Sequence, residues 1–173
     1  MGICVTELRK LVVKPTLEFL DAYSEAAEDL IVGTAAQESE LGFHLNIGPT
    51  DANQQDTGYG IYRITAEEHQ HVWDTYLVNH PQLASDIRGL ASQHEFLKKP
   101  HLELATNLSY ATAIAWAIYQ SNGASAPAHE DVTSMAQTWF DHFHHNPTIN
   151  GSPETFAESY RRLVMPSKGE LAA

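Results

Sequence analysis

The segment Gly33-Thr-Ala-Ala-Gln-Glu-Ser-Glu-Leu-Gly42 has the pattern of the last turns of a buried helix with an acid near its end. Ala35 and Ala36 are small enough to let a helix pack closely, and Gly42 is well placed to end it. The preceding turns are apolar. Glu38 is therefore expected near the carboxyl end of a helix that packs into the core.

Two effects at that position favour the protonated form of Glu38. Partial desolvation disfavours the carboxylate, and the negative end of the helix dipole repels it. A carboxylic acid that keeps its proton near neutral pH is what general acid catalysis needs. The alternative is an ordinary helix terminus at which Glu38 or Glu40 simply faces water.

Composition limits the classes of function. The chain has 173 residues, 43% of them hydrophobic and 18% charged, which suits one globular domain over residues 1–173. A net charge of −12 argues against binding to nucleic acid or to an anionic membrane surface. No run of residues has the length and apolar character of a membrane span, and we see no secretory signal at the amino terminus. The single cysteine, Cys4, excludes an intramolecular disulfide and a multi-cysteine zinc site.

Apolar periodicity and capping residues predict a mainly α-helical fold. Ser24 is a good cap for the helix that runs to about Glu38, and Thr65 with Glu68 forms a capping box for the next long helix. Pro15 is expected to interrupt an earlier helix that begins near Thr6. The remaining helices are predicted at Leu83–Phe96, Asn107–Gln120, Val132–His144 and Pro153–Met165. The helix at 107–120 is apolar on most of its circumference, so we expect it to be the central buried helix.

Between about residues 46 and 62 the composition changes to Asn, Gly, Pro, Asp, Gln and Thr. This change predicts an ordered loop or a short hairpin rather than a linker, because the core pattern resumes directly afterwards. Residues after about 166 are expected to be frayed.

Several motifs resemble those of the soluble lytic transglycosylases and goose-type lysozymes. Ala36-Gln-Glu-Ser39 is followed about twenty residues later by Gly58-Tyr-Gly-Ile-Tyr-Arg-Ile-Thr65, and Asn107-Leu108 then opens an apolar helix. Ala117-Ile-Tyr119 is loosely similar to a further family motif. The segment from Gln137 to Tyr160 resembles phage-encoded members. Two residues depart from the family pattern, because Arg63 stands where the family usually has Gln and Gln120 where it has Asn.

The resemblance implies a lysozyme-like fold and a site on peptidoglycan. Glu38 would protonate the oxygen between N-acetylmuramic acid and N-acetylglucosamine and would later act as base, giving a 1,6-anhydro end. Gly58 and Gly60 would let the backbone lie close to the sugar. The implied substrate-binding residues are Ser39, Tyr59, Gly60, Ile61, Tyr62, Arg63 and Tyr119. Each tyrosine has the alternative of an ordinary place at the rim of the core.

A hydrolytic lysozyme acting on the same bond is the nearest alternative enzyme, and it needs a second carboxylate to position water. Asp51, Asp56, Glu67 and Glu68 are the candidates, although acids in the first turn of a helix are favoured for other reasons. A further alternative is a non-catalytic virion structural or glycan-binding module, which Arg63 keeps open.

Ten histidines invite a metal hypothesis, in particular His69 with His71 and the run from His142 to His145. Residues two apart on a helix do not face the same way, and no His-Glu-x-x-His motif is present. We therefore expect no metal and no cofactor. The expected partners are a peptidoglycan glycan strand and virion proteins. The expected location is the virion or the host cytoplasm, with action on the wall in the periplasm.

Overall fold

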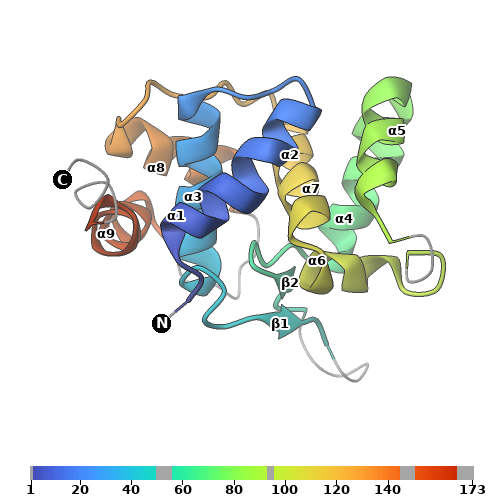
Figure 1. Cartoon of the computed structure of the whole chain (residues 1–173), viewed down its shortest axis with the longest axis horizontal. Helices are drawn as coiled ribbons and strands as arrows, with labels where there is room; N and C mark the ends of the chain where they lie inside the picture. Colours follow the sequence, from blue (N-terminus) through green and yellow to red (C-terminus); the bar gives the residue numbers. More distant parts are fainter. Residues whose placement is uncertain (1, 50–55, 93–95, 145–150, 167–173) are drawn as a thin grey trace.

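The computed structural model describes residues 2–49, 56–92, 96–144 and 151–166, and within them the chain is mainly helical. Figure 1 shows α3 and α7 in the middle of the molecule, with α8 and α9 on one side and α4 and α5 on the other. The two short strands lie at one end of this arrangement, near the carboxyl end of α3. The prediction of a mainly α-helical fold is confirmed.

The amino-terminal helix is not interrupted at Pro15, and that prediction was wrong. Helix α1 (Val5–Leu8) continues through a π-helical turn (Arg9–Val13) into α2 (Lys14–Phe19). Pro15 is the second residue of α2 and follows the π-helical turn directly. The wider turn directly before it lets the helix pass the proline ring without a break.

Helix α3 (Glu25–Ser39) begins as predicted, because the Ser24 hydroxyl accepts a hydrogen bond from the Ala27 N–H at 3.0 Å. Its end differs from the prediction. Glu40, not Gly42, is the first residue in the left-handed conformation, at φ 51°. The Leu41 N–H bonds back to the Ala35 carbonyl, and the Leu41 side chain is buried, so burial of this leucine offsets the strain of a non-glycine cap.

The short hairpin predicted between about residues 46 and 62 is confirmed. Strand β1 (Asn46–Ile47) pairs antiparallel with β2 (Tyr59–Gly60), with Asn46 opposite Gly60. Gly60 has φ 69°, and a Cβ atom there would lie 1.8 Å from the Leu104 carbonyl oxygen. Only glycine fits at this contact between the hairpin and helix α6 (Glu103–Thr106).

Helix α4 (Ala66–His71) begins at the predicted capping box, in which Thr65 and Glu68 bond each other's backbone N–H groups. It continues through a π-helical turn (Val72–Tyr76) and a short 3-10 turn (Leu77–Asn79). Helix α5 (Pro81–Leu90) is shorter than the predicted Leu83–Phe96 element, because Ala91 is extended, and a 3-10 turn (Pro100–Leu102) precedes α6.

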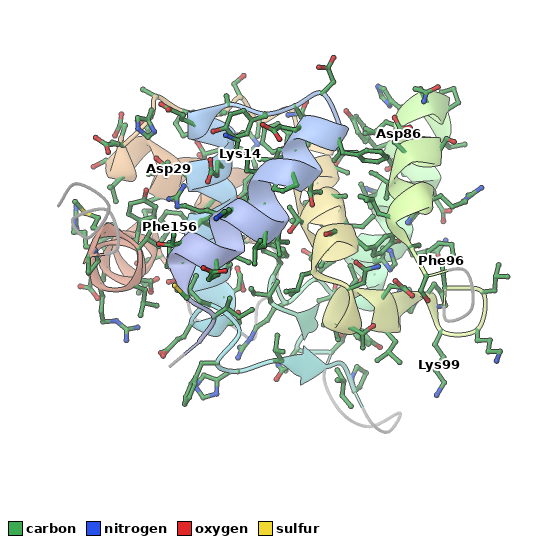
Figure 2. The ribbon with its side chains drawn as sticks, viewed as in Figure 1. Lys14, Asp29, Asp86, Phe96, Lys99 and Phe156 are labelled. Atoms are coloured by element: carbon green, nitrogen blue, oxygen red, sulfur yellow. The ribbon has the colours of Figure 1, made fainter. Side chains whose placement is uncertain are left out.

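The predicted central helix is confirmed. Helix α7 (Leu108–Ser121) is capped by Asn107, and every residue from Tyr110 to Tyr119 is buried. Helices α8 (Val132–His142) and α9 (Pro153–Leu163) pack on α3, and Figure 2 shows Phe156 of α9 directed toward α3. Gly33 of α3 makes room for that ring, since a Cβ atom would lie 2.5 Å from it.

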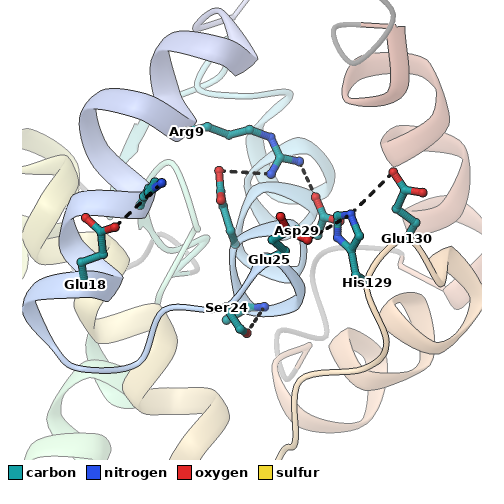
Figure 3. A network of polar contacts seen from close by, with 10 residues as sticks. Arg9, Glu18, Ser24, Glu25, Asp29, His129 and Glu130 are labelled. Carbon is teal, nitrogen blue, oxygen red and sulfur yellow. Dashed lines mark hydrogen bonds and ion pairs between the residues drawn. The ribbon is translucent and has the colours of Figure 1, made fainter. Parts of the chain in front are cut away.

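A polar network ties the amino-terminal helix to α3 and to the loop before α8 (Figure 3). The carboxylate of Asp29 has no exposed surface, and it accepts a 2.6 Å hydrogen bond from Arg9. His129 lies 2.8 Å from the other carboxylate oxygen, and Arg9 also pairs with Glu28 at 3.3 Å. Burying Asp29 is tolerated because Arg9 pairs with its charge and each carboxylate oxygen has a polar partner.

Within the described residues, none of the helices combines the length and the apolar character that crossing a membrane requires. Residues 167–173, where fraying was expected, lie outside the described part of the chain.

Candidate active site

Glu38 lies one residue before the end of α3, and only 5% of its surface is exposed. The indole N–H of Trp139, on α8, donates a 2.9 Å hydrogen bond to its Oε1. Trp139 is fully buried and packs against Phe156 and His144. The carboxyl group is therefore held in one orientation by a rigid donor from another helix.

This environment raises the pKa of Glu38 to about 8. The largest cause is burial, which disfavours the charged form, and the nearby carboxylate of Glu68 acts in the same direction. The hydrogen bond from Trp139 and the positive charge of Arg63 act in the opposite direction. Glu38 is thus protonated at neutral pH, as the sequence predicted.

Ser39 connects the end of α3 to the segment Gly58–Thr65. Its hydroxyl donates to the Ile61 carbonyl at 2.7 Å and accepts from the Gly42 N–H at 2.8 Å. A serine at this position therefore fixes the backbone after β2 beside the turn that carries Glu38. These contacts give Ser39 a role in positioning the backbone. Its predicted contact with a sugar stays a prediction.

Arg63 has an unusual backbone for a non-glycine residue, with φ 48°. Its carbonyl lies against Gly58, where a Cβ atom would overlap it, so Gly58 is required for this tight turn. Among the described residues, the buried Nε of Arg63 has no hydrogen-bond partner. The turn thus holds a guanidinium group within electrostatic reach of Glu38, and one of its nitrogens still has a hydrogen bond to give.

The other predicted substrate-binding residues are mostly buried. Ile61, Tyr62 and Tyr119 have no exposed surface. The Tyr62 hydroxyl bonds to Thr112 at 2.8 Å, and the Tyr119 hydroxyl bonds to Thr34 at 2.7 Å. Burial raises the pKa of Tyr119, and the charge of Glu38 adds to the shift, so this phenol is close to the acid. Tyr59 is partly exposed on β2, and its ring centre lies 5.9 Å from that of His101.

The candidate second carboxylates differ in their surroundings. Asp56 accepts hydrogen bonds from the backbone N–H groups of Gly58 and Ala66. Glu68 serves the capping box of α4, and Glu67 is exposed. Asp51 lies outside the described residues. Asp56 and Glu68 therefore both hold local backbone structure at the start of α4.

The described histidines lie in more than one place. In the described ranges, no group of three or more His, Cys, Asp or Glu residues is arranged to hold a metal ion. His142 bonds to the Asn122 carbonyl, and His145 lies outside the described residues. His69 is buried in a separate cluster with His101, Tyr110 and Trp73.

Trp139 is the site residue that the sequence did not assign. Met135, Trp139 and Phe143 recur at helical spacing, which is typical of a face that packs on the core, and all three are buried. Apolar spacing does not predict the hydrogen bond of the indole N–H, because its partner, Glu38, is 101 residues away in the sequence.

Two cavities are lined by residues between His69 and His101, and Glu38 is not among those residues. Searches against protein-family models, curated protein sequences and solved structures find no match for this chain.

Proposed function

We propose that this chain has a lysozyme-like fold and is a peptidoglycan lytic transglycosylase in which Glu38 is the single acid and base. The observation that carries the proposal is the environment of Glu38, which is a buried carboxyl with a pKa raised to about 8. An acid that keeps its proton at neutral pH can give that proton to a glycosidic oxygen.

The reaction uses one carboxyl group twice, first as acid and then as base. Glu38 protonates the oxygen between N-acetylmuramic acid and N-acetylglucosamine, and the bond from that oxygen to C1 of the muramic acid breaks. The C6 hydroxyl of the same muramic acid then attacks C1, and its proton returns to the Glu38 carboxylate. The products are a 1,6-anhydro end and a new hydroxyl on the leaving sugar, so no second carboxylate is needed.

The groups around Glu38 suit an acid that must also act as a base. Burial and the charge of Glu68 favour the protonated form, which starts the reaction. Trp139 and Arg63 favour the carboxylate, which forms when the proton leaves. These opposed effects hold the pKa near the pH of the reaction, where transfer in both directions is efficient.

Hydrolysis of the same bond by a muramidase is the second candidate. It requires a carboxylate that positions water on the other side of the sugar. Asp56 and Glu68 both accept hydrogen bonds at the start of α4, which favours transglycosylation over hydrolysis.

The third candidate is a non-catalytic glycan-binding or virion module. The resemblance to phage-encoded enzymes supports, within this proposal, an enzyme carried by a virion that opens the cell wall.

Purified peptidoglycan sacculi separate these candidates. The wild-type chain is expected to release soluble fragments, and Glu38→Gln is expected to release none. Glu40→Gln is the matched control, because the Glu40 side chain is partly exposed and lies two residues away. Mass spectrometry of the fragments then identifies the reaction, because anhydro ends indicate transglycosylation and reducing ends indicate hydrolysis. Equal release by wild type and Glu38→Gln, or no release by either, would overturn the proposal.

A further inference from the structure

A cavity of about 500 Å³ opens between α4 and α5, and the reaction proposed for Glu38 does not use it. Its lining includes His69, Gln70, Trp73, Arg88, Phe96 and His101, and we name it the α4–α5 cavity. Ligand pockets have volumes of roughly 300 to 1,000 Å³ and combine an apolar wall with a few polar groups. The cavity meets both criteria.

Its inner wall contains a chain of hydrogen bonds that joins Trp73, Tyr110 and His69. The indole N–H of Trp73 can only donate, and it lies 3.1 Å from the Tyr110 hydroxyl and 3.3 Å from Nε2 of His69. Nε2 of His69 also lies 2.7 Å from the Tyr110 hydroxyl, and the tautomer of the ring decides which of the two donates.

The same chain of hydrogen bonds reaches His101. Nδ1 of His69 lies 2.9 Å from Nδ1 of His101, so one of these two nitrogens donates to the other. Burial lowers the pKa of His69 to about 3 and also lowers that of His101, which agrees with two neutral rings. His101 lines the cavity, and its ring is held there by the bond to His69.

The outer wall supplies a cation and two aromatic rings. The Arg88 guanidinium lies over the Trp73 ring, 5.3 Å from its centre, and the Phe96 ring is tilted against the same indole at 6.2 Å. Figure 2 shows Phe96 below the end of α5. Gln70 is bonded to both carboxylate oxygens of Asp74, so that carboxylate is already partly satisfied.

We propose that the α4–α5 cavity binds an N-acetylated sugar of the glycan strand, at a second site separate from Glu38. A sugar ring has an apolar face for Trp73 and Phe96, and the acetamido carbonyl accepts from the Arg88 guanidinium. The choice of a sugar rests on the proposed function. A second site would hold the strand on the protein between successive cleavages.

Nuclear magnetic resonance of the full-length Glu38→Gln protein tests this site. The three tryptophan indole N–H signals, assigned with single Trp→Phe variants, are followed during titration with tri-N-acetylchitotriose. We expect the Trp73 signal to move on binding at the cavity and the Trp139 signal to move on binding at the candidate active site. Arg88→Ala should weaken the Trp73 response by about tenfold and leave the Trp139 response unchanged. Arg161→Ala, an exposed arginine of α9, is the matched control.

The outcomes distinguish the two proposals. If Trp139 responds and Trp73 does not, the cavity proposal fails and the proposed function stands. If Trp73 responds, with loss in Arg88→Ala, and Trp139 does not, the cavity binds sugar and the proposed function is contradicted. If muramyl dipeptide moves the Trp73 signal and chitotriose does not, the ligand is the peptide-bearing part of the wall and the assignment to a sugar is wrong.

Discussion

The indole N–H of Trp139 and the carboxyl of Glu38 are joined by a 2.9 Å hydrogen bond between two buried side chains from different helices. The bond fixes the orientation of an acid that burial would otherwise leave protonated but free to rotate. It also favours the carboxylate, so it lowers a pKa that would be higher without it.

Trp139→Phe should therefore change the pH dependence of glycan cleavage. The ring packing on Phe156 is kept, but the pKa of Glu38 rises because the donor is gone. We expect the loss of activity at high pH to shift to higher pH, and kcat/KM at pH 7 to fall by about tenfold because the acid loses its fixed orientation. Trp116→Phe is the control. An unchanged pH profile in Trp139→Phe would mean that the bond has no role in the reaction.

Glu38→Gln should make the protein more stable at neutral pH. The folded-state pKa is raised from 4.5 to about 8, so between these values the unfolded chain releases a proton that the folded chain keeps. The free energy of unfolding of the wild type should therefore fall with rising pH, by about 1.4 kcal/mol per pH unit from this group. Glutamine does not ionise, so urea denaturation of the variant should lack this component. Parallel pH curves for the two proteins would contradict the burial of a neutral acid.

Gly60→Ala and Gly123→Ala separate backbone strain from steric overlap. Both glycines have positive φ, but only Gly60 faces another backbone, at the Leu104 carbonyl. Gly123→Ala should cost about 1 kcal/mol of stability, whereas Gly60→Ala should cost about 3 kcal/mol or more because the hairpin must move away from α6. Thermal unfolding of both variants checks this, and equal losses would show that the overlap is relieved easily.

Asp29→Asn should destabilise the attachment of the amino-terminal helix. The substitution leaves Arg9 without the charge that it contacts at 2.6 Å, in a site where the carboxylate has no exposed surface. Arg9 is partly exposed, so solvent screens part of the loss, and we expect a cost of about 2 to 3 kcal/mol. Glu18→Gln is the control, since its 3.9 Å pair with Lys14 is half exposed and should be worth less than about 1 kcal/mol. Equal effects in urea denaturation would contradict this ranking.

Local rules predicted much of the fold. Ser24, Asn107 and the box of Thr65 with Glu68 gave three helix starts, because a cap depends only on residues within one turn. The same rules were wrong at Pro15 and at Gly42. In the first case a π-helical turn accommodates the proline, and in the second the helix ends in a left-handed Glu40 followed by a buried Leu41. Neither compensation is visible from local sequence.

The candidate active site was also predicted only in part. The burial and raised pKa of Glu38 followed from its place at the apolar end of a helix. Its bond to Trp139 and the charges of Arg63 and Glu68 come from other elements, so only the tertiary structure brings them together. The cluster of His69, His101, Tyr110 and Trp73 also joins residues up to 41 positions apart. Their sequence spacing gave no sign of a shared cavity.

The most direct test is a titration of the Glu38 side-chain carboxyl carbon by nuclear magnetic resonance, in full-length protein labelled with ¹³C. The Glu38→Gln variant identifies the signal. We predict a midpoint near pH 8, with the group still protonated at pH 7. A midpoint near pH 4.5 would show an ordinary ionised glutamate and would contradict Glu38 as the general acid.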